Sequence, residues 1–110
     1  MTKNLYVTAT WPQGPSVTTV FTGFKNDQQI NDFKTSPSLW QQFGGLDMSH
    51  INMSVMENEI PSNAVYVQMI KNVMKVQQFS NNMWSDVPSS SLPEEFTYYV
   101  SKYMIQPNMA

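Results

Sequence analysis

The 110-residue chain contains no cysteine and no arginine, and only 13% of its residues are charged. An average soluble domain is about 25% charged. Without cysteine, the chain cannot form a disulfide framework, a thiolate zinc site or a cysteine nucleophile. Its six lysines are scattered, whereas binding to a phosphate backbone needs clustered cations. We therefore expect no nucleic-acid partner.

The chain also lacks long apolar runs. None reaches the roughly 20 apolar residues that a membrane-spanning helix needs. Residues 1–7 pass directly into strand-forming residues and show neither the basic nor the apolar segment of a signal peptide. We expect an intracellular protein, cytoplasmic by default, that has no membrane partner.

Residues suited to catalysis are few. His50 is the only histidine, and Asp47 lies three residues before it, where its carboxylate could orient a general base. Such a pair is common by chance, and an exposed histidine on a strand explains it more simply. Glu57 and Glu59 are too few for an oxygen-ligand metal site, and the chain has no glycine-rich phosphate loop. We predict no catalytic, cofactor-binding or metal-binding residues and no enzymatic activity.

The chain is rich instead in neutral polar residues and large apolar side chains. It contains three tryptophans, five tyrosines, six phenylalanines and nine methionines, and its formal net charge is only -2. Disordered chains have few aromatic residues and a high net charge, so this composition is typical of a folded protein. We expect residues 1–110 to form a single globular domain with one hydrophobic core.

Apolar and polar residues alternate with the period of a β-strand over residues 4–11, 16–24 and 49–56. Pro12-Gln13-Gly14-Pro15 separates the first two segments and is typical of a turn, because proline fixes φ and glycine accepts positive φ. The first two segments therefore predict an N-terminal hairpin, and the third predicts a further strand with one solvated face.

Three segments carry helix signals. Asp27 is placed to cap a short helix. Pro37 suits the first turn of a second helix, which Gly44-Gly45 would end. Ser91-Leu92-Pro93-Glu94 has the form of a capping box, and the apolar spacing after it predicts a last helix at about 92–105.

Residues 63–79 fit two structures. Their apolar residues share one side of a helical wheel, and methionine, lysine and glutamine are good helix formers. The alternative is a hairpin, because Val65-Tyr66-Val67 is β-prone and Lys71-Asn72 suits a two-residue turn. We favour the helix. Residues 80–91 are polar and predict a loop.

Together these segments predict an α+β fold. The expected architecture is an antiparallel sheet of three or more strands, packed on one face by two or three helices. The sheet would contain the N-terminal hairpin and the strand near 49–56, and the last helix would be the one at about 92–105.

Two groups of residues are candidates for contact with a partner. Met83 and Trp84 lie in the polar segment and, if displayed, offer the large adaptable contact area that interfaces use; the alternative is that Trp84 plugs back into the core. The outward faces of the hairpin carry uncharged side chains, among them Tyr6, Thr8, Thr10, Thr18 and Thr22. Natural sheet edges are usually protected by lysine or proline, which these strands lack. We therefore predict an unprotected hairpin edge that a partner or a second copy could extend.

The leading hypothesis is a non-enzymatic protein that binds another protein, with a homodimer as one form of that contact. The size fits a small accessory or inhibitor protein, and the lysine-only, asparagine-rich composition suggests an AT-rich genome such as that of a virus or mobile element. One alternative is a structural or virion component. Another is a small-molecule-binding domain or small enzyme with a pocket between sheet and helices. The polar groups of such a pocket would come from Trp40, His50, Tyr98, Tyr99 and Tyr103.

Overall fold

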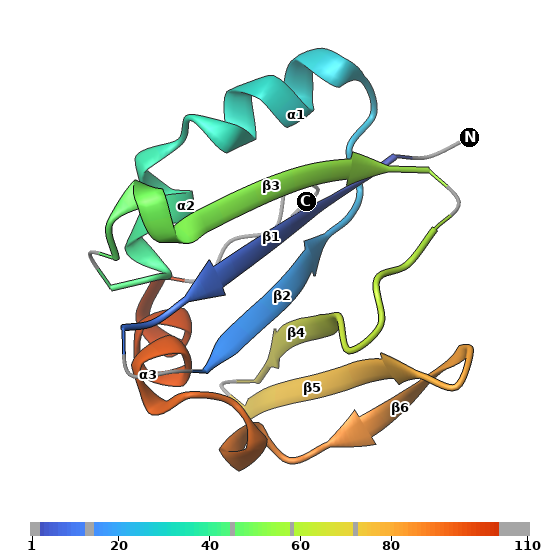
Figure 1. Ribbon diagram of the computed structural model, residues 1–110, viewed down its shortest axis with the longest axis vertical. Helices are drawn as coiled ribbons and strands as arrows, with labels where there is room; N and C mark the ends of the chain where they lie inside the picture. The colour runs from blue at the N-terminus through green and yellow to red at the C-terminus, as the bar shows by residue number, and fades with distance from the viewer. Residues whose placement is uncertain (1–2, 13–14, 45, 58, 72, 104–110) are drawn as a thin grey trace.

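The chain forms a six-stranded sheet with helices packed against it (Figure 1). The computed structural model describes residues 3–12, 15–44, 46–57, 59–71 and 73–103. Its strands are β1 Asn4–Thr10, β2 Ser16–Phe21, β3 Ile51–Met56, β4 Val65–Ile70, β5 Val73–Ser80 and β6 Met83–Val87. They lie in the order β3-β1-β2-β4-β5-β6. The predicted α+β class is confirmed.

Neighbouring strands pair antiparallel except where β2 meets β4. Those two strands are joined by one parallel pair, Thr19 with Val65. On either side of this pair the pairing is continuous, because β1 pairs with β2 and β3, and β5 pairs with β4 and β6. The sheet is therefore mixed, and it consists of an N-terminal part (β3, β1, β2) and a C-terminal part (β4, β5, β6) with a narrow connection between them.

The helices cover one face of the sheet, as predicted (Figure 1). They are α1 Asp27–Lys34, α2 Pro37–Gln41 and α3 Glu94–Tyr103, with short 3-10 turns η1 Met48–His50 and η2 Ser89–Ser91. The core between the two layers includes Leu5, Val7, Ala9, Trp11, Phe21, Val65, Val67 and Val76 from the sheet side and Ile30, Phe33, Leu39, Phe43, Phe96 and Val100 from the helical side. No helix within the described residues is long and apolar enough to cross a membrane.

The N-terminal hairpin is confirmed, although Gln13 and Gly14 of its predicted turn lie outside the described residues. Leu5, Val7 and Ala9 are fully buried on the helical face, which is the predicted alternation. The predicted unprotected edge at this hairpin is wrong. β3 pairs along the outer side of β1 and β4 meets the outer side of β2, so the edges of the sheet are β3 and β6. These pairings join segments far apart in the chain, which no local pattern specifies.

The first two helices begin close to their predicted positions. The side chain of Asn26, rather than Asp27, caps α1 by accepting a hydrogen bond from the backbone N–H of Gln29 at 2.9 Å. Asp27 lies in the first turn, where its charge complements the helix dipole. α2 begins at Pro37 as predicted. Gly44 follows with a φ of 62°, the left-handed conformation that commonly ends a helix.

The last helix begins at Glu94, two residues later than predicted. The predicted capping box is wrong, because Ser91 belongs to η2 and its hydroxyl donates a hydrogen bond to the carbonyl of Pro88 at 2.7 Å. Residues 104 and 105 of the predicted helix, and Gly45 of the preceding helix end, lie outside the described residues.

The favoured helix at residues 63–79 is wrong, because this segment is the β4–β5 hairpin. Val65, Val67 and Val76 are each 2% exposed on the helical face of the sheet. Lys71 in the turn has a φ of 51°, and Asn72 lies outside the described residues. β-Branched side chains pack well on a pleated surface, and burial of these valines outweighs the modest helix propensities of their neighbours.

The predicted loop at residues 80–91 is also wrong over residues 83–87. Residues 83–87 form β6, which pairs with β5 from Ser80–Met83 to Val76–Val87. Asn81 and Asn82 connect the two strands with φ values of 53° and 62°, as in a type I′ turn. Asparagine tolerates positive φ, so this asparagine pair is a hairpin signal within a segment whose polarity suggests a loop.

Candidate interaction groove

The face of the sheet opposite the helices carries a second, smaller apolar cluster. Its buried members are Tyr6, Val20 and Ala64, and the half-buried side chains packed against them are Met56, Ile60, Tyr66 and Trp84. Helical residues are not among the members of this cluster within the described chain. The cluster is therefore closed by the strands and by the segment between β3 and β4, which contributes Ile60.

An open groove of about 340 Å³ lies on this face, and we name it the aromatic groove. Its lining residues are Asn4, Tyr6, Val20, Thr22, Ile60, Tyr66, Gln77 and Trp84, none of which is charged. They come from both parts of the sheet: β1 and the end of β2 on one side, and β4, β5 and β6 on the other. The groove therefore spans the narrow connection between β2 and β4.

Strand register places Trp84 in the groove. Trp84 stands opposite Phe79 in the β5–β6 pairing, and the two ring centroids are 5.3 Å apart with an interplanar angle of 60°. The two-residue turn sets this register, and a slip of one residue would move Trp84 to the other face. Trp84 is half-buried, so it is neither a core residue nor fully displayed.

Several polar groups of the groove are open to a ligand. The hydroxyl of Tyr66 accepts a hydrogen bond from Gln68 Nε2 at 3.3 Å. By contrast, the side chains of Tyr6, Thr22 and Trp84 make no hydrogen bond within the described residues, and none of their polar atoms is fully buried without a partner. These three groups can therefore bond to water or to a bound molecule.

Three of the predicted interaction residues meet in this groove. Tyr6 and Thr22 come from the predicted hairpin surface, and Trp84 comes from the predicted Met-Trp pair. The sequence places them in separate groups, and the strand order β1-β2-β4-β5-β6 brings them to one site. Met83 does not line the groove but lies at the start of β6, where it is 61% exposed.

The remaining predicted residues form a separate row of hydroxyl groups. The hydroxyls of Thr8 and Thr18 are hydrogen-bonded at 2.8 Å, and those of Thr10 and Ser16 at 3.0 Å. These pairs stand directly opposite in the β1–β2 register. Their hydroxyls bond to each other, so they stabilise the hairpin and are less available to a partner than those in the groove.

Sequence reasoning missed five residues that line the groove: Asn4, Val20, Ile60, Tyr66 and Gln77. Because a helix is predicted at residues 63–79, the strand alternation of this segment is overlooked. That alternation points Val65 and Val67 to the core and Tyr66 and Gln68 to the opposite face. That alternation is the signal that could have found Tyr66. No sequence signal places Ile60, because its position depends on the path between β3 and β4.

The possible catalytic pair gains no geometric support. His50 is exposed at the end of η1. The carboxylate of Asp47 accepts a hydrogen bond from the backbone N–H of Ser49 at 3.2 Å, which is the geometry of a local turn. Within the described residues, no group of three or more histidine, aspartate or glutamate side chains could hold a metal ion.

The predicted pocket between sheet and helices also lacks support. A hollow of about 380 Å³ lies between the sheet and the start of α3, where Val17 and Val65 face Leu92, but none of the five expected groups lines it. Tyr98 is 54% exposed and Tyr103 is 37% exposed on α3, whereas His50 is exposed on η1. The three tyrosines contact one another on α3, with ring centroids 5.0 Å apart for Tyr98–Tyr99 and 6.4 Å apart for Tyr99–Tyr103, so they do not form one pocket lining with the exposed His50.

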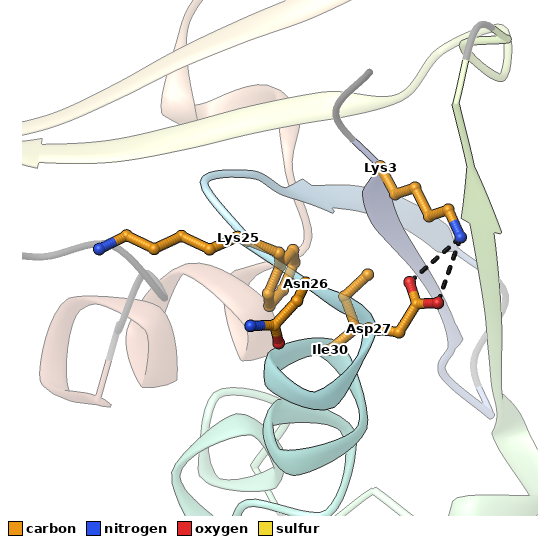
Figure 2. Close-up of a pocket in the computed structure, with 6 residues that line it drawn as sticks. Lys3, Lys25, Asn26, Asp27 and Ile30 are labelled. Atoms are coloured by element: carbon orange, nitrogen blue, oxygen red, sulfur yellow. Dashed lines mark hydrogen bonds and ion pairs between the residues drawn. The ribbon is translucent and has the colours of Figure 1, made fainter.

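A small hollow of about 80 Å³ lies where the N-terminus of α1 approaches the start of β1 (Figure 2). Its acidic group is already paired, because Lys3 Nζ lies 3.1 Å from Asp27 Oδ1. Lys3 Nζ also lies 4.0 Å from a carboxylate oxygen of Glu57 at the end of β3. These contacts tie α1 to the strand ends, so a structural role accounts for the hollow.

One titratable group on α3 is perturbed. Lys102 Nζ donates a hydrogen bond to the hydroxyl of Tyr98 at 3.4 Å and lies 5.2 Å from the centroid of the Tyr98 ring. The hydrogen bond and the electrostatic attraction of Tyr98 raise the pKa of Lys102.

Comparisons with protein-family models, with curated proteins and with solved structures found no match for this chain. The geometry of the groove is therefore the basis for the functional proposal.

Proposed function

We propose that this protein is a non-enzymatic interaction module that binds another protein through the aromatic groove. One observation carries the proposal. Tyr6, Tyr66 and Trp84 line an uncharged groove on the face of the sheet that the helical core does not use. Tyr6 is 3% exposed, whereas Tyr66 and Trp84 are only half-buried beside it. A folded chain gains stability by burying aromatic rings, so two rings left partly open around a groove suggest a surface for binding.

The chemistry of the groove favours a protein partner. Interface centres are enriched in tyrosine, tryptophan and methionine and depleted of charged residues. Tryptophan and tyrosine are also enriched among the interface residues whose substitution by alanine weakens binding most. The open hydrogen-bonding groups of Tyr6, Thr22 and Trp84 would fix the orientation of such a partner. Its contact surface should be apolar at the centre, with neutral polar groups around it.

The experiment is quantitative affinity capture from the native host with two matched variants. Thr22→Lys places a charge in the groove, whereas Thr97→Lys makes the same change on α3. We expect Thr22→Lys to reduce recovery of the partner at least about tenfold, because burying an unpaired charge at an interface costs more than about 1.4 kcal/mol. Thr97→Lys should recover the partner as the wild type does. Equal recovery by both variants would refute the groove as the binding site.

A second candidate is a small neutral ligand in the same groove. The observation in its favour is the volume of about 340 Å³, which lies within the range of roughly 300–1,000 Å³ for ligand sites. A thermal-shift screen of uncharged small molecules tests it. A compound that stabilises the wild type but not the Thr22→Lys variant would favour this candidate over the protein partner.

A further inference from the structure

The two edges of the sheet differ in what lies beside them. β3 has α1 along its flank (Figure 1), and Asp27, Ile30 and Asn31 of α1 line one hollow with Val55 of β3. A helix beside an edge strand obstructs the approach of another strand. β6 pairs only with β5, and η2, which follows it, packs back against β5. The outer side of β6 is therefore the more accessible edge.

β6 lacks most of the features that protect edge strands. Its sequence is Met83-Trp84-Ser85-Asp86-Val87, with no proline, no lysine and one charged residue. Met83, Ser85 and Asp86 are exposed, and Met83 is an apolar side chain that is 61% exposed. A strand of this kind can add a neighbour through its backbone groups.

The two faces of β6 limit how another copy could pair with it. Trp84 and Asp86 point to the groove face, where Trp84 joins the second cluster, and Val87 packs against the core on the helical face. Residues directly opposite in an antiparallel pair point to the same face. A two-fold pairing of β6 with itself must therefore be centred on a residue and not between two residues.

Among these registers, the one centred on Ser85 fits best. It places Met83 opposite Val87 of the second copy and Trp84 opposite its Asp86, so all five residues are paired. A register centred on Asp86 would place two carboxylates directly opposite each other, which is destabilising. A register centred on Trp84 would leave Val87 opposite the turn residue Asn81.

Hydrogen bonding agrees with the register centred on Ser85. The two-residue turn closes on the pair Ser80–Met83, and hydrogen-bonded and non-hydrogen-bonded pairs alternate from there along β5 and β6. This alternation directs the backbone N–H and C=O groups of Trp84 and Asp86 outward. In the register centred on Ser85, Trp84 of one copy lies opposite Asp86 of the other. Each outward N–H and C=O group of these residues therefore finds a hydrogen-bond partner.

We infer that β6 is a self-association edge, at which a second copy of this chain adds its own β6 antiparallel and two-fold symmetric about Ser85. The small net charge of -2 causes little repulsion between copies. A ladder of five residues buries less surface than the roughly 1,200–2,000 Å² of a stable interface. We therefore expect a weak dimer whose population rises with protein concentration. This inference goes beyond the proposed function, because it concerns the outer edge of β6 and not the groove.

Single-cysteine crosslinking tests the inference on the full chain. Because the chain contains no cysteine, Ser85→Cys introduces one thiol at the expected two-fold axis. Opposite Cα atoms in a non-hydrogen-bonded pair are about 4.5 Å apart, within the range for a disulfide. Ser54→Cys is the matched control, since Ser54 is an exposed serine on the other edge strand. Both variants are oxidised at increasing protein concentration, and dimers are separated without reduction.

We expect Ser85→Cys to crosslink at least about tenfold faster than Ser54→Cys, because association raises the local thiol concentration. This difference in crosslinking rate should vanish in urea, which unfolds the chain. Equal rates for the two variants in native buffer would overturn the inference. In sedimentation of the cysteine-free chain, Ser85→Lys should weaken association about fivefold by opposing two like charges. An unchanged association constant in Ser85→Lys would also overturn it.

The result is separable from the capture experiment. If Thr22→Lys loses the partner and Ser85→Cys does not crosslink preferentially, the groove function stands and the self-association edge is refuted. If Ser85→Cys crosslinks preferentially and Thr22→Lys recovers the partner normally, the edge is supported and the groove is refuted.

Discussion

β1 and β6 belong to one sheet but are buried to very different extents. Leu5, Tyr6 and Val7 of β1 are each 3% exposed or less although they point to alternate faces, whereas three of the five residues of β6 are exposed. The N-terminal part lies between the helical core and the second cluster. The C-terminal part contributes mainly Val65, Val67 and Val76 to the core. We therefore expect the first part to supply more of the stability and the second part to supply accessible surface.

The difference accounts for where the candidate sites lie. The aromatic groove spans the boundary between the two parts, and the inferred self-association edge is the outermost strand of the exposed part. Most of β1 is buried on both faces and paired on both sides, and only Asn4 and Tyr6 near its start line the groove. Binding surfaces should therefore concentrate on the less buried part.

The largest expected effect compares one phenylalanine from each part. Phe21 is 2% exposed and its ring centroid lies 4.9 Å from that of Phe33, whereas Phe79 is half-buried beside Trp84. We expect Phe21→Ala to lower the free energy of unfolding by about 3–5 kcal/mol. Phe79→Ala should cost about 1–2 kcal/mol, because less of its ring leaves water on folding. Urea denaturation measures both free energies of unfolding. Equal losses in the two variants would contradict the difference in burial between the two parts.

A smaller effect is expected in the helical layer that backs the N-terminal part. A Cβ at Gly44 would overlap the ring of Tyr99, and the φ of 62° is strained for alanine. We expect Gly44→Ala to cost about 1–3 kcal/mol, measured by urea denaturation. In the background of Tyr99→Ala, Gly44→Ala should cost less, because the overlap is removed. Additive costs would show that backbone strain alone is responsible.

The same layer contains one buried group that should be improved by substitution. Gln42 is 2% exposed, and its Nε2 is buried without a hydrogen-bond partner. We expect Gln42→Met to raise the free energy of unfolding by about 1–2 kcal/mol, because it removes an unsatisfied donor while retaining volume. Gln41→Met at the neighbouring exposed position should change it by less than about 0.5 kcal/mol. Thermal denaturation measures both, and a loss of stability in Gln42→Met would contradict the prediction.

The smallest expected effect concerns one lysine from each part. Lys3 pairs with Asp27 at 3.1 Å in the N-terminal part, whereas Lys75 on β5 makes no ion pair within the described residues. We expect Lys3→Gln to cost about 0.2–1 kcal/mol, since both partners are substantially exposed. That cost should shrink in 1 M salt, which screens exposed charges. Lys75→Gln should leave the free energy of unfolding unchanged, as measured by urea denaturation. An equal loss of stability in both variants would show that the Lys3–Asp27 ion pair does not stabilise the fold.

Local patterns predicted the elements whose hydrophobic periodicity and residue propensities agree. The hairpin of β1 and β2, the strand β3, and helices α1 and α3 all follow from short-range periodicity. The hairpins β4–β5 and β5–β6 did not follow, because methionine, lysine and glutamine suit a helix and because an asparagine-rich turn suggests a loop. In both cases burial of a few valines and one tryptophan outweighed the local preference.

The candidate site shows the same division. Tyr6, Thr22 and Trp84 could be chosen from sequence as uncharged side chains on outward faces. Their convergence with Tyr66 could not, because it depends on which strand lies beside β2.

By itself, the sequence determined that the chain has no thiol chemistry, few charges and enough aromatic residues for a core, because these are properties of composition. It also determined the alternating faces of β1 and β2, because side chains point alternately along a strand. Only the tertiary structure decided the order of the strands, the edge position of β6 and the uncharged groove between the two parts. These features depend on contacts between distant segments, which are selected by burial of the whole chain and not by any local pattern.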